Sequence, residues 1–118
     1  MPVASEEIRA WSAALEAEAL TWPSVRRCPM FGLVGLYRGD QIFAALPRTR
    51  CLGLPDSLAF KLERASARVL EKIEREPRIQ TTIMKARRWY LFGLSSTADL
   101  RDALNWLHQA YKAASQGA

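Results

Sequence analysis

The sequence offers few residues that could form a nucleophile and general-base arrangement of the kind that hydrolytic enzymes use. His108 is the only histidine, and a Ser-His-Asp arrangement could be drawn from it with Ser95 and Asp99. No spacing in the sequence brings these groups within hydrogen-bond reach of one another. His108 fits better as a partly exposed packing residue at a helix edge, and the serine as part of a helix cap. We predict no catalytic residue, and an enzyme that depends on His108 stays open as a third alternative.

Cysteines and glycines show no metal-binding or phosphate-binding spacing. Cys28 and Cys51 form no Cys-x-x-Cys motif, so we expect two free thiols; a disulfide requires Cα atoms within about 7 Å. Gly32, Gly35 and Gly39 lack the Gly-Lys-Ser/Thr ending of a phosphate-binding loop, so we expect structural turns and close backbone approach. A lone histidine cannot supply a multi-histidine metal site, and we predict no cofactor.

A basic stretch beside aromatic residues is the sharpest feature that could contact a partner. Lys85, Arg87 and Arg88 precede Trp89, and basic tips interleaved with aromatic rings can hold phosphates and stack bases. A solvated hairpin turn with its rings in the core explains the same residues, and we favour it. Trp106 flanks the apolar stripe of the last predicted helix; it could anchor a partner, although packing over the sheet edge is favoured.

The positive charge is concentrated in the middle of the chain. The net charge is +5 over 118 residues, and Pro23 to Leu94 carries 14 basic against 6 acidic residues. Such a section can attract an anionic partner, so nucleic acid stays open as an alternative. Arg26, Arg27, Arg48 and Arg50 would extend a basic face if the fold brought them together. No apolar run approaches the roughly 18 residues of a membrane span, and no signal segment is evident, so we expect a cytoplasmic protein without a membrane partner.

The elements that position these residues begin with a helix and an apolar hairpin. Ser5 can cap a helix that ends before Pro23. Two apolar strands, Leu33 to Tyr37 and Gln41 to Leu46, are hinged near Gly39 and need cover from helices. The segment between the helix and this hairpin is expected to be extended, and its proline makes it a poor central strand.

The second half predicts a strand, a helix, a second hairpin and a terminal helix. We therefore expect a single α+β domain with the order α-β-β-β-α-β-β-α and an antiparallel sheet packed against helices. The predicted elements are a strand over Ser57 to Leu62, a helix over Arg64 to Arg75, strands over Arg78 to Met84 and Arg87 to Leu94, and a helix after the capping box Ser96 to Asp99.

Several short motifs between Val25 and Ala114 share the pattern of a known family. They are Arg27-Cys28-Pro29-Met30-Phe31-Gly32, Gly35-Leu36-Tyr37-Arg38-Gly39-Asp40, Phe43-Ala44, Leu58-Ala59-Phe60-Lys61-Leu62, Trp89-Tyr90 and Ala103-Leu104-Asn105-Trp106-Leu107. In these motifs the chain resembles the TfoX N-terminal domain family. It departs from the family where Leu33 replaces a common glycine and where the loop from Pro47 to Asp56 is longer than usual.

The resemblance implies a compact α+β domain with a secretion-chaperone-like antiparallel sheet, which the related YjbR-like domains share. The best-known member of the family regulates DNA uptake competence and carries a second domain. The family offers no established catalytic or ligand-binding residue to transfer. The resemblance therefore implies a non-enzymatic interaction or regulatory domain with a protein partner or self-association, while a nucleic-acid-binding module that uses the hairpin from Lys85 to Tyr90 stays the alternative.

Overall fold

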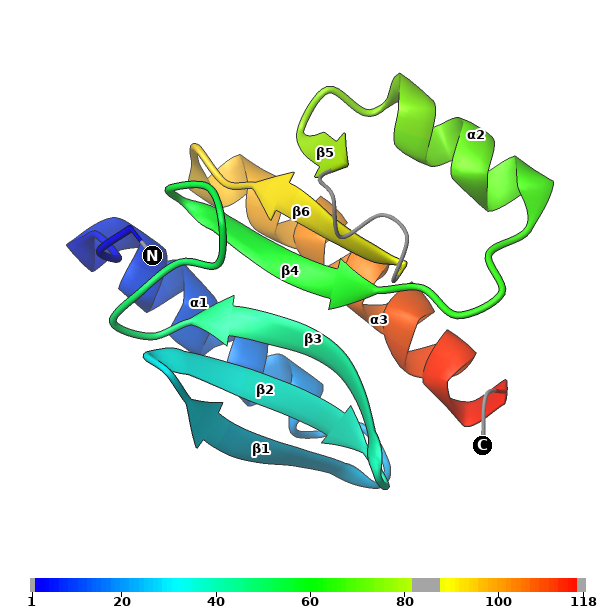
Figure 1. The fold of residues 1–118 in the computed structure, drawn as a ribbon. Coiled ribbons are helices and arrows are strands. Elements are labelled where there is room, and N and C mark those ends of the chain that lie inside the picture. The colour runs from blue at the N-terminus through cyan, green and yellow to red at the C-terminus, as the bar shows by residue number, and fades with distance from the viewer. Residues whose placement is uncertain (1, 82–87, 117–118) are drawn as a thin grey trace.

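The computed structural model describes residues 2–81 and 88–116, which form an α+β fold (Figure 1). Within these residues the chain forms three α-helices, a short 3-10 turn and an antiparallel sheet of six strands. The fold class agrees with the prediction. The elements are α1 (Glu6–Ala19), β1 (Val25–Met30), β2 (Leu33–Arg38), β3 (Gln41–Pro47), β4 (Ser57–Lys61), α2 (Ala67–Arg75), β5 (Ile79–Thr81), β6 (Trp89–Gly93), η2 (Thr97–Asp99) and α3 (Leu100–Gln116).

The sheet has one more strand than the predicted order. The strands lie in the order β1-β2-β3-β4-β6-β5, and every neighbouring pair is antiparallel. The additional strand is β1, which corresponds to the segment expected only to be extended. Pro29 has no backbone N–H, and an edge strand tolerates this because one side of its backbone has no neighbouring strand. The proline therefore directs β1 to the sheet edge and does not prevent a strand.

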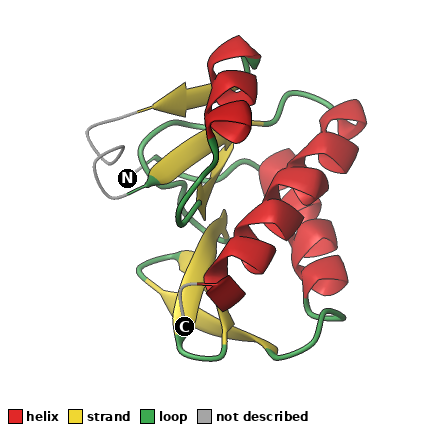
Figure 2. Cartoon of the chain, turned by 90° about the vertical axis from the view of Figure 1, so that its right-hand side faces the viewer, coloured by secondary structure: helices red, strands yellow, loops and turns green. Residues whose placement is uncertain are grey.

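Helices α1 and α3 cover one face of the sheet and contact each other (Figures 1 and 2). The core between them and the sheet contains large side chains that are completely buried, including Leu36, Phe43, Phe60, Phe92 and Leu107. A smaller apolar cluster lies on the opposite face, where the loop after β3 contributes partial cover. That cluster contains Leu33, Ala45, Ala59 and Leu91, with Leu52, Leu54 and Trp89 packed against it.

A polar contact docks α1 on the sheet. Ser5 caps the helix as predicted, with its Oγ accepting from the Ile8 N–H at 3.2 Å. Ser12 is buried and its Oγ donates to the Pro47 carbonyl oxygen at 2.6 Å, so the buried face of α1 includes a serine that hydropathy spacing would leave out. Trp11, an apolar residue that follows Ile8 at helical spacing, is only half-buried. The helix therefore meets the end of β3 through a hydrogen bond as well as through apolar packing.

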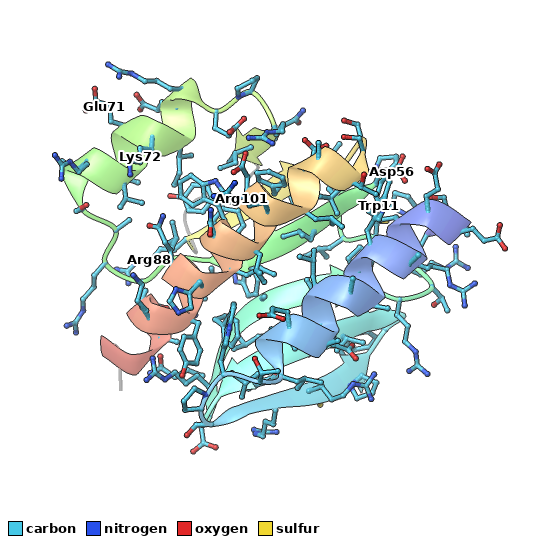
Figure 3. All side chains as sticks on the ribbon, turned by 180° about the vertical axis from the view of Figure 1, so that it is seen from behind. Trp11, Asp56, Glu71, Lys72, Arg88 and Arg101 are labelled. Atoms are coloured by element: carbon cyan, nitrogen blue, oxygen red, sulfur yellow. The ribbon has the colours of Figure 1, made fainter. Side chains whose placement is uncertain are left out.

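Helix α2 begins three residues later than predicted and lies beside β5, away from α1 (Figures 1 and 3). Arg64 has a φ of +52°, which is incompatible with a right-handed helix. Ser66 then caps α2, with its Oγ accepting from the Val69 N–H at 3.2 Å. Ile73 is the only buried residue of α2, and Leu70 is 39% exposed. This helix therefore contributes little to the described core.

The glycines of the first three strands differ in role. Gly32 and Gly39, with φ of +78° and +60°, lie in the turns at the two ends of β2. Gly35 differs from the predicted turn, because it lies inside β2 opposite Cys28. A Cβ atom at Gly35 would come within 2.4 Å of the Met30 Cε atom, so the glycine gives room to a side chain of the neighbouring strand.

Candidate functional site

The predicted basic hairpin is only partly described. Lys85 and Arg87 lie outside the described residues. Arg88 forms an ion pair with Glu63, whose carboxylate also binds the Lys61 ammonium group at 2.9 Å. Hydrogen bonding to Lys61, together with that to Arg88, holds the pKa of Glu63 below its ordinary value. Arg88 is therefore paired with a carboxylate that it shares with Lys61, which leaves one net positive charge on these three residues.

The two tryptophans singled out from the sequence are used in packing. Trp89 packs against the smaller apolar cluster that contains Ala59 and Leu91, on the face of the sheet opposite α1 and α3. Trp106 is 8% exposed, and its ring stacks on Phe60 with centroids 5.6 Å apart. This position of Trp106 corresponds to the packing role that the sequence favoured for it.

His108 and the serines before η2 lie in different parts of the fold. The His108 ring packs edge-on against Trp22 at 4.9 Å and stacks on Tyr111 at 5.8 Å. Ser95 donates its N–H and its Oγ–H to the Asp99 carboxylate at 2.8 and 3.0 Å. Asp99 and His108 are nine positions apart, which is about 13 Å along a helix. The fold therefore does not bring the three groups into a hydrolytic arrangement.

Arg78 is the centre of an acidic cluster at the start of β5. Its guanidinium group donates to Glu76 at 2.6 Å, to Asp102 at 2.8 Å and to Asp99 at 3.0 Å, and it lies 4.9 Å from the centroid of the Phe92 ring. The cluster connects the loop before β5 to η2 and α3, and it leaves the arginine saturated with carboxylates. We call these four charged residues the Arg78 cluster.

Hydrogen bonds account for the acidity of the carboxylates in this cluster. The Ser95 backbone N–H, with further donors from Arg78 and Ser96, lowers the pKa of Asp99 to about 2. The Arg78 side chain likewise lowers the pKa of Glu76. The carboxylate of Asp99 also accepts from the Ser96 N–H at 3.1 Å, as the predicted capping box requires. The Arg78 cluster therefore has the features of a structural ion-pair network.

Two adjoining hollows lie near β1 and β2, at the other edge of the sheet from the Arg78 cluster, and both are lined by Arg9 and Arg48. The first hollow, of about 510 Å³, lies between α1 and the sheet and also contains Glu6, Glu16 and Arg27. The second hollow, of about 460 Å³, lies beside the β1–β2 turn. Its lining includes Arg9, Arg48, Thr49, Met30, Phe31 and Gly32. We call the two hollows together the arginine cleft.

The charges of the arginine cleft are unevenly balanced. In the first hollow, Arg27 pairs with Glu16 at 3.3 Å between nitrogen and oxygen. The second hollow is lined by no carboxylate among the described residues. The guanidinium groups of Arg9 and Arg48 are exposed and, within residues 2–81 and 88–116, have no hydrogen-bond or ion-pair partner. The second hollow is therefore suited to an anionic group.

The β1–β2 turn presents an aromatic ring at the edge of this hollow. Met30 pairs with Leu33, so Phe31 and Gly32 are the two central residues, with φ of +51° and +78°. Positive φ at both positions is typical of a type I′ turn, which favours Asn-Gly. A bulky residue at positive φ is an outlier, and Phe31 is also 84% exposed. Neither apolar burial nor backbone preference explains a phenylalanine at this position.

Hydrogen bonds fix this turn beside the arginines. The Gly32 carbonyl oxygen accepts from the backbone N–H groups of Arg48 at 3.2 Å, Thr49 at 2.9 Å and Arg50 at 3.0 Å. The chain after β3 is thereby held against the turn. Each of the three side chains is therefore held by a different element. The β1–β2 turn positions Phe31, the end of β3 positions Arg48, and the capped helix α1 positions Arg9.

Other site types find no support in the described part of the chain. No group of three or more histidine, cysteine, aspartate or glutamate side chains gathers there as metal ligands would. Cys28 and Cys51 are both free thiols, the second of them buried. No helix among residues 2–81 and 88–116 has the length and apolar character needed to cross a membrane.

The fold and the cleft define an α+β domain with an open basic site. Comparisons with protein-family models, with curated proteins and with solved structures give no match to this chain. The resemblance to the TfoX N-terminal domain family therefore rests on the sequence motifs alone.

The sequence signals for this site were only partial. Arg27 and Arg48 were named as members of a basic face that depended on convergence, and the fold brings both to the arginine cleft. Arg9 was missed because it lies on a predicted helix with no other basic residue beside it in the sequence to mark a binding site. Phe31 was named only as part of a family motif and not as a site residue. The signal that it would be exposed is its position directly before a glycine in a two-residue turn.

Proposed function

We propose that this chain is a non-enzymatic interaction domain that binds an anionic partner in the arginine cleft. The observation that carries the proposal is the conjunction of Phe31, exposed and at positive φ, with two guanidinium groups that have no partner in the described fold. Residues in strained conformations persist where the surrounding structure holds them, often at binding sites. The motif resemblance to the TfoX N-terminal domain family supports the same class of function.

The chemistry of the cleft fits binding and no particular reaction. Arginine presents a planar fork of donors that matches carboxylate and phosphate oxygens, and it stays charged at every physiological pH. Arg9 and Arg48 line the same two hollows, so a single extended anion can contact both. The net charge of +5 adds a long-range attraction that accelerates encounter with such a partner.

A polyanion column tests this function without knowledge of the natural partner. The purified protein is applied to immobilised heparin at low ionic strength and eluted with a salt gradient. We expect the double variant Arg9→Gln, Arg48→Gln to elute at a clearly lower salt concentration than the wild type, because screened charge contacts in the cleft are lost.

A charge-matched variant makes the result specific to the cleft. Arg68→Gln with Arg101→Gln removes the same charge from exposed positions of α2 and α3 that do not line the cleft. We expect this control to elute close to the wild type. Equal shifts for the two double variants would mean that net charge alone causes retention, and the proposed function would be wrong.

A further inference from the structure

We infer that the partner is single-stranded nucleic acid, with phosphates on Arg9 and Arg48 and an unpaired base stacked on Phe31. This inference rests on the proposed function and specifies its ligand class. Proteins that bind single strands combine a basic groove along the backbone with aromatic rings on which bases stack. The second hollow has both parts, and its volume of about 460 Å³ is within the range of ligand pockets.

The ring of Phe31 favours a base over other anionic groups. Phenylalanine has no polar atom, so its exposed ring can contribute only through apolar or stacking contact. The paired bases of a duplex are stacked on one another and offer no free face to a side chain at a turn, whereas an unpaired base does. An acidic peptide would use the arginines, but its carboxylates would not need the ring. The combination therefore selects a ligand with both phosphates and exposed planar groups.

The geometry of the turn keeps the ring available. Three N–H groups of residues 48–50 bind the Gly32 carbonyl oxygen, so the turn cannot move away from Arg48 without losing them. Phe31 lies at the tip of this hairpin with a positive φ, and the residue is 84% exposed. The first hollow contributes less to phosphate binding, because Glu6 and Glu16 lie in it. We therefore place the base and its nearest phosphates in the second hollow.

Fluorescence anisotropy with paired probes tests the inference. The probes are labelled single strands of about 12 nucleotides, within the usual site sizes of about 4–16. One is oligodeoxythymidine, one is the RNA equivalent, and one is an abasic strand with the same number of phosphates. We expect the wild type to bind the base-containing strands about 5-fold or more tightly than the abasic strand, since stacking is worth about 1–3 kcal/mol per base.

Variants at the turn show whether the ring causes this preference. Phe31→Asn should reduce binding of the base-containing strands to the level of the abasic strand. Leu70→Asn changes an exposed apolar residue of α2 and should leave the preference unchanged. Comparison of the DNA and RNA strands then identifies which sugar the site prefers, and tighter binding of either one supports the inference.

Other outcomes would overturn the inference and separate it from the proposed function. Equal affinity for the abasic and base-containing strands, or tighter binding of a polyglutamate peptide of equal charge, would exclude base stacking as the basis of recognition. If the cleft variants still lost retention on heparin, the interaction function would stand and its ligand would be a different anion. If heparin retention did not depend on the cleft, both proposals would be wrong.

Discussion

Arg78 and the pair formed by Arg9 and Arg48 lie in opposite electrostatic settings. The Arg78 guanidinium group binds three carboxylates at 2.6–3.0 Å, and its side chain is 29% exposed. Arg9 and Arg48 are exposed, line the same hollows and have no partner in the described residues. The same side chain thus stabilises the fold at one side of the sheet and stays available for a ligand at the other. The difference is that neighbouring elements supply carboxylates to Arg78 and none to Arg9 or Arg48. It predicts that substitution of Arg78 lowers the stability of the fold, whereas substitution of the other two arginines does not.

The largest effect should follow loss of the Arg78 side chain. Arg78→Met leaves the carboxylates of Asp99 and Glu76 without their cation, and we expect the free energy of unfolding to fall by about 2–3 kcal/mol. Chemical denaturation measures the change. Arg75→Met is the control, because Arg75 pairs with Glu71 on an exposed helix face at 2.7 Å, and loss of such a pair costs less than about 0.5 kcal/mol. Equal effects of the two variants would contradict the structural role of the Arg78 cluster.

Acid should weaken the same cluster. The folded-state pKa of Asp99 is about 2, below the ordinary value of 3.8, so its ionised form stabilises the fold at neutral pH. This contribution is lost as the pH falls through about 4 to 2, and it amounts to roughly 2 kcal/mol. Denaturation series across that range measure it, and Asp99→Asn should flatten the profile. A wild-type profile that matches that of Asp99→Asn would show that the carboxylate is not stabilised in the folded protein.

Substitution of Phe31 should raise the stability of the fold, whereas substitution of Arg78 should lower it. Asparagine accepts positive φ more readily than phenylalanine and is favoured at this position of a type I′ turn. We therefore expect Phe31→Asn to raise the free energy of unfolding by about 0.5–1 kcal/mol, although it removes the proposed stacking surface. Thermal and chemical denaturation measure the change. A loss of stability would mean that the ring supports the fold and would weaken its assignment to binding.

The smallest effect is expected for the cleft arginines. Arg9→Gln and Arg48→Gln remove no ion pair within the described residues, so together they should change the free energy of unfolding by less than about 0.5 kcal/mol. The measurement is the same denaturation series used for Arg78→Met. A loss comparable to that of Arg78→Met would show that these arginines are structural, and the contrast between the two settings would disappear.

Much of the fold could be predicted from local chemistry. Ser5 as a helix cap, the turn at Gly39 and the burial of Leu58 and Phe60 on one face of a strand all follow from rules that act within a few residues. The edge strand β1 was not counted, because Pro29 excludes a central position and no local signal specifies an edge. Pairing across the sheet decides that position.

The candidate site was harder to predict, because its residues converge only in the fold. Arg9 and Arg48 are 39 positions apart, and no periodicity relates a residue of the first helix to one that follows the third strand. Arg78 resembled any other basic residue until η2 and α3 brought Asp99 and Asp102 against it. The sequence therefore indicated an excess of positive charge without showing which arginines are neutralised.

The dependence of oligonucleotide affinity on salt tests the role of the arginine cleft most directly. Affinity of the wild type is measured over a series of salt concentrations, beside Arg9→Gln with Arg48→Gln and the control Arg68→Gln with Arg101→Gln. For single strands each phosphate contact contributes about 0.7 to the slope of log affinity against log salt. We predict that the cleft variant loses about 1.4 from the slope while the control keeps the slope of the wild type. Identical slopes for the three proteins would contradict binding in the cleft.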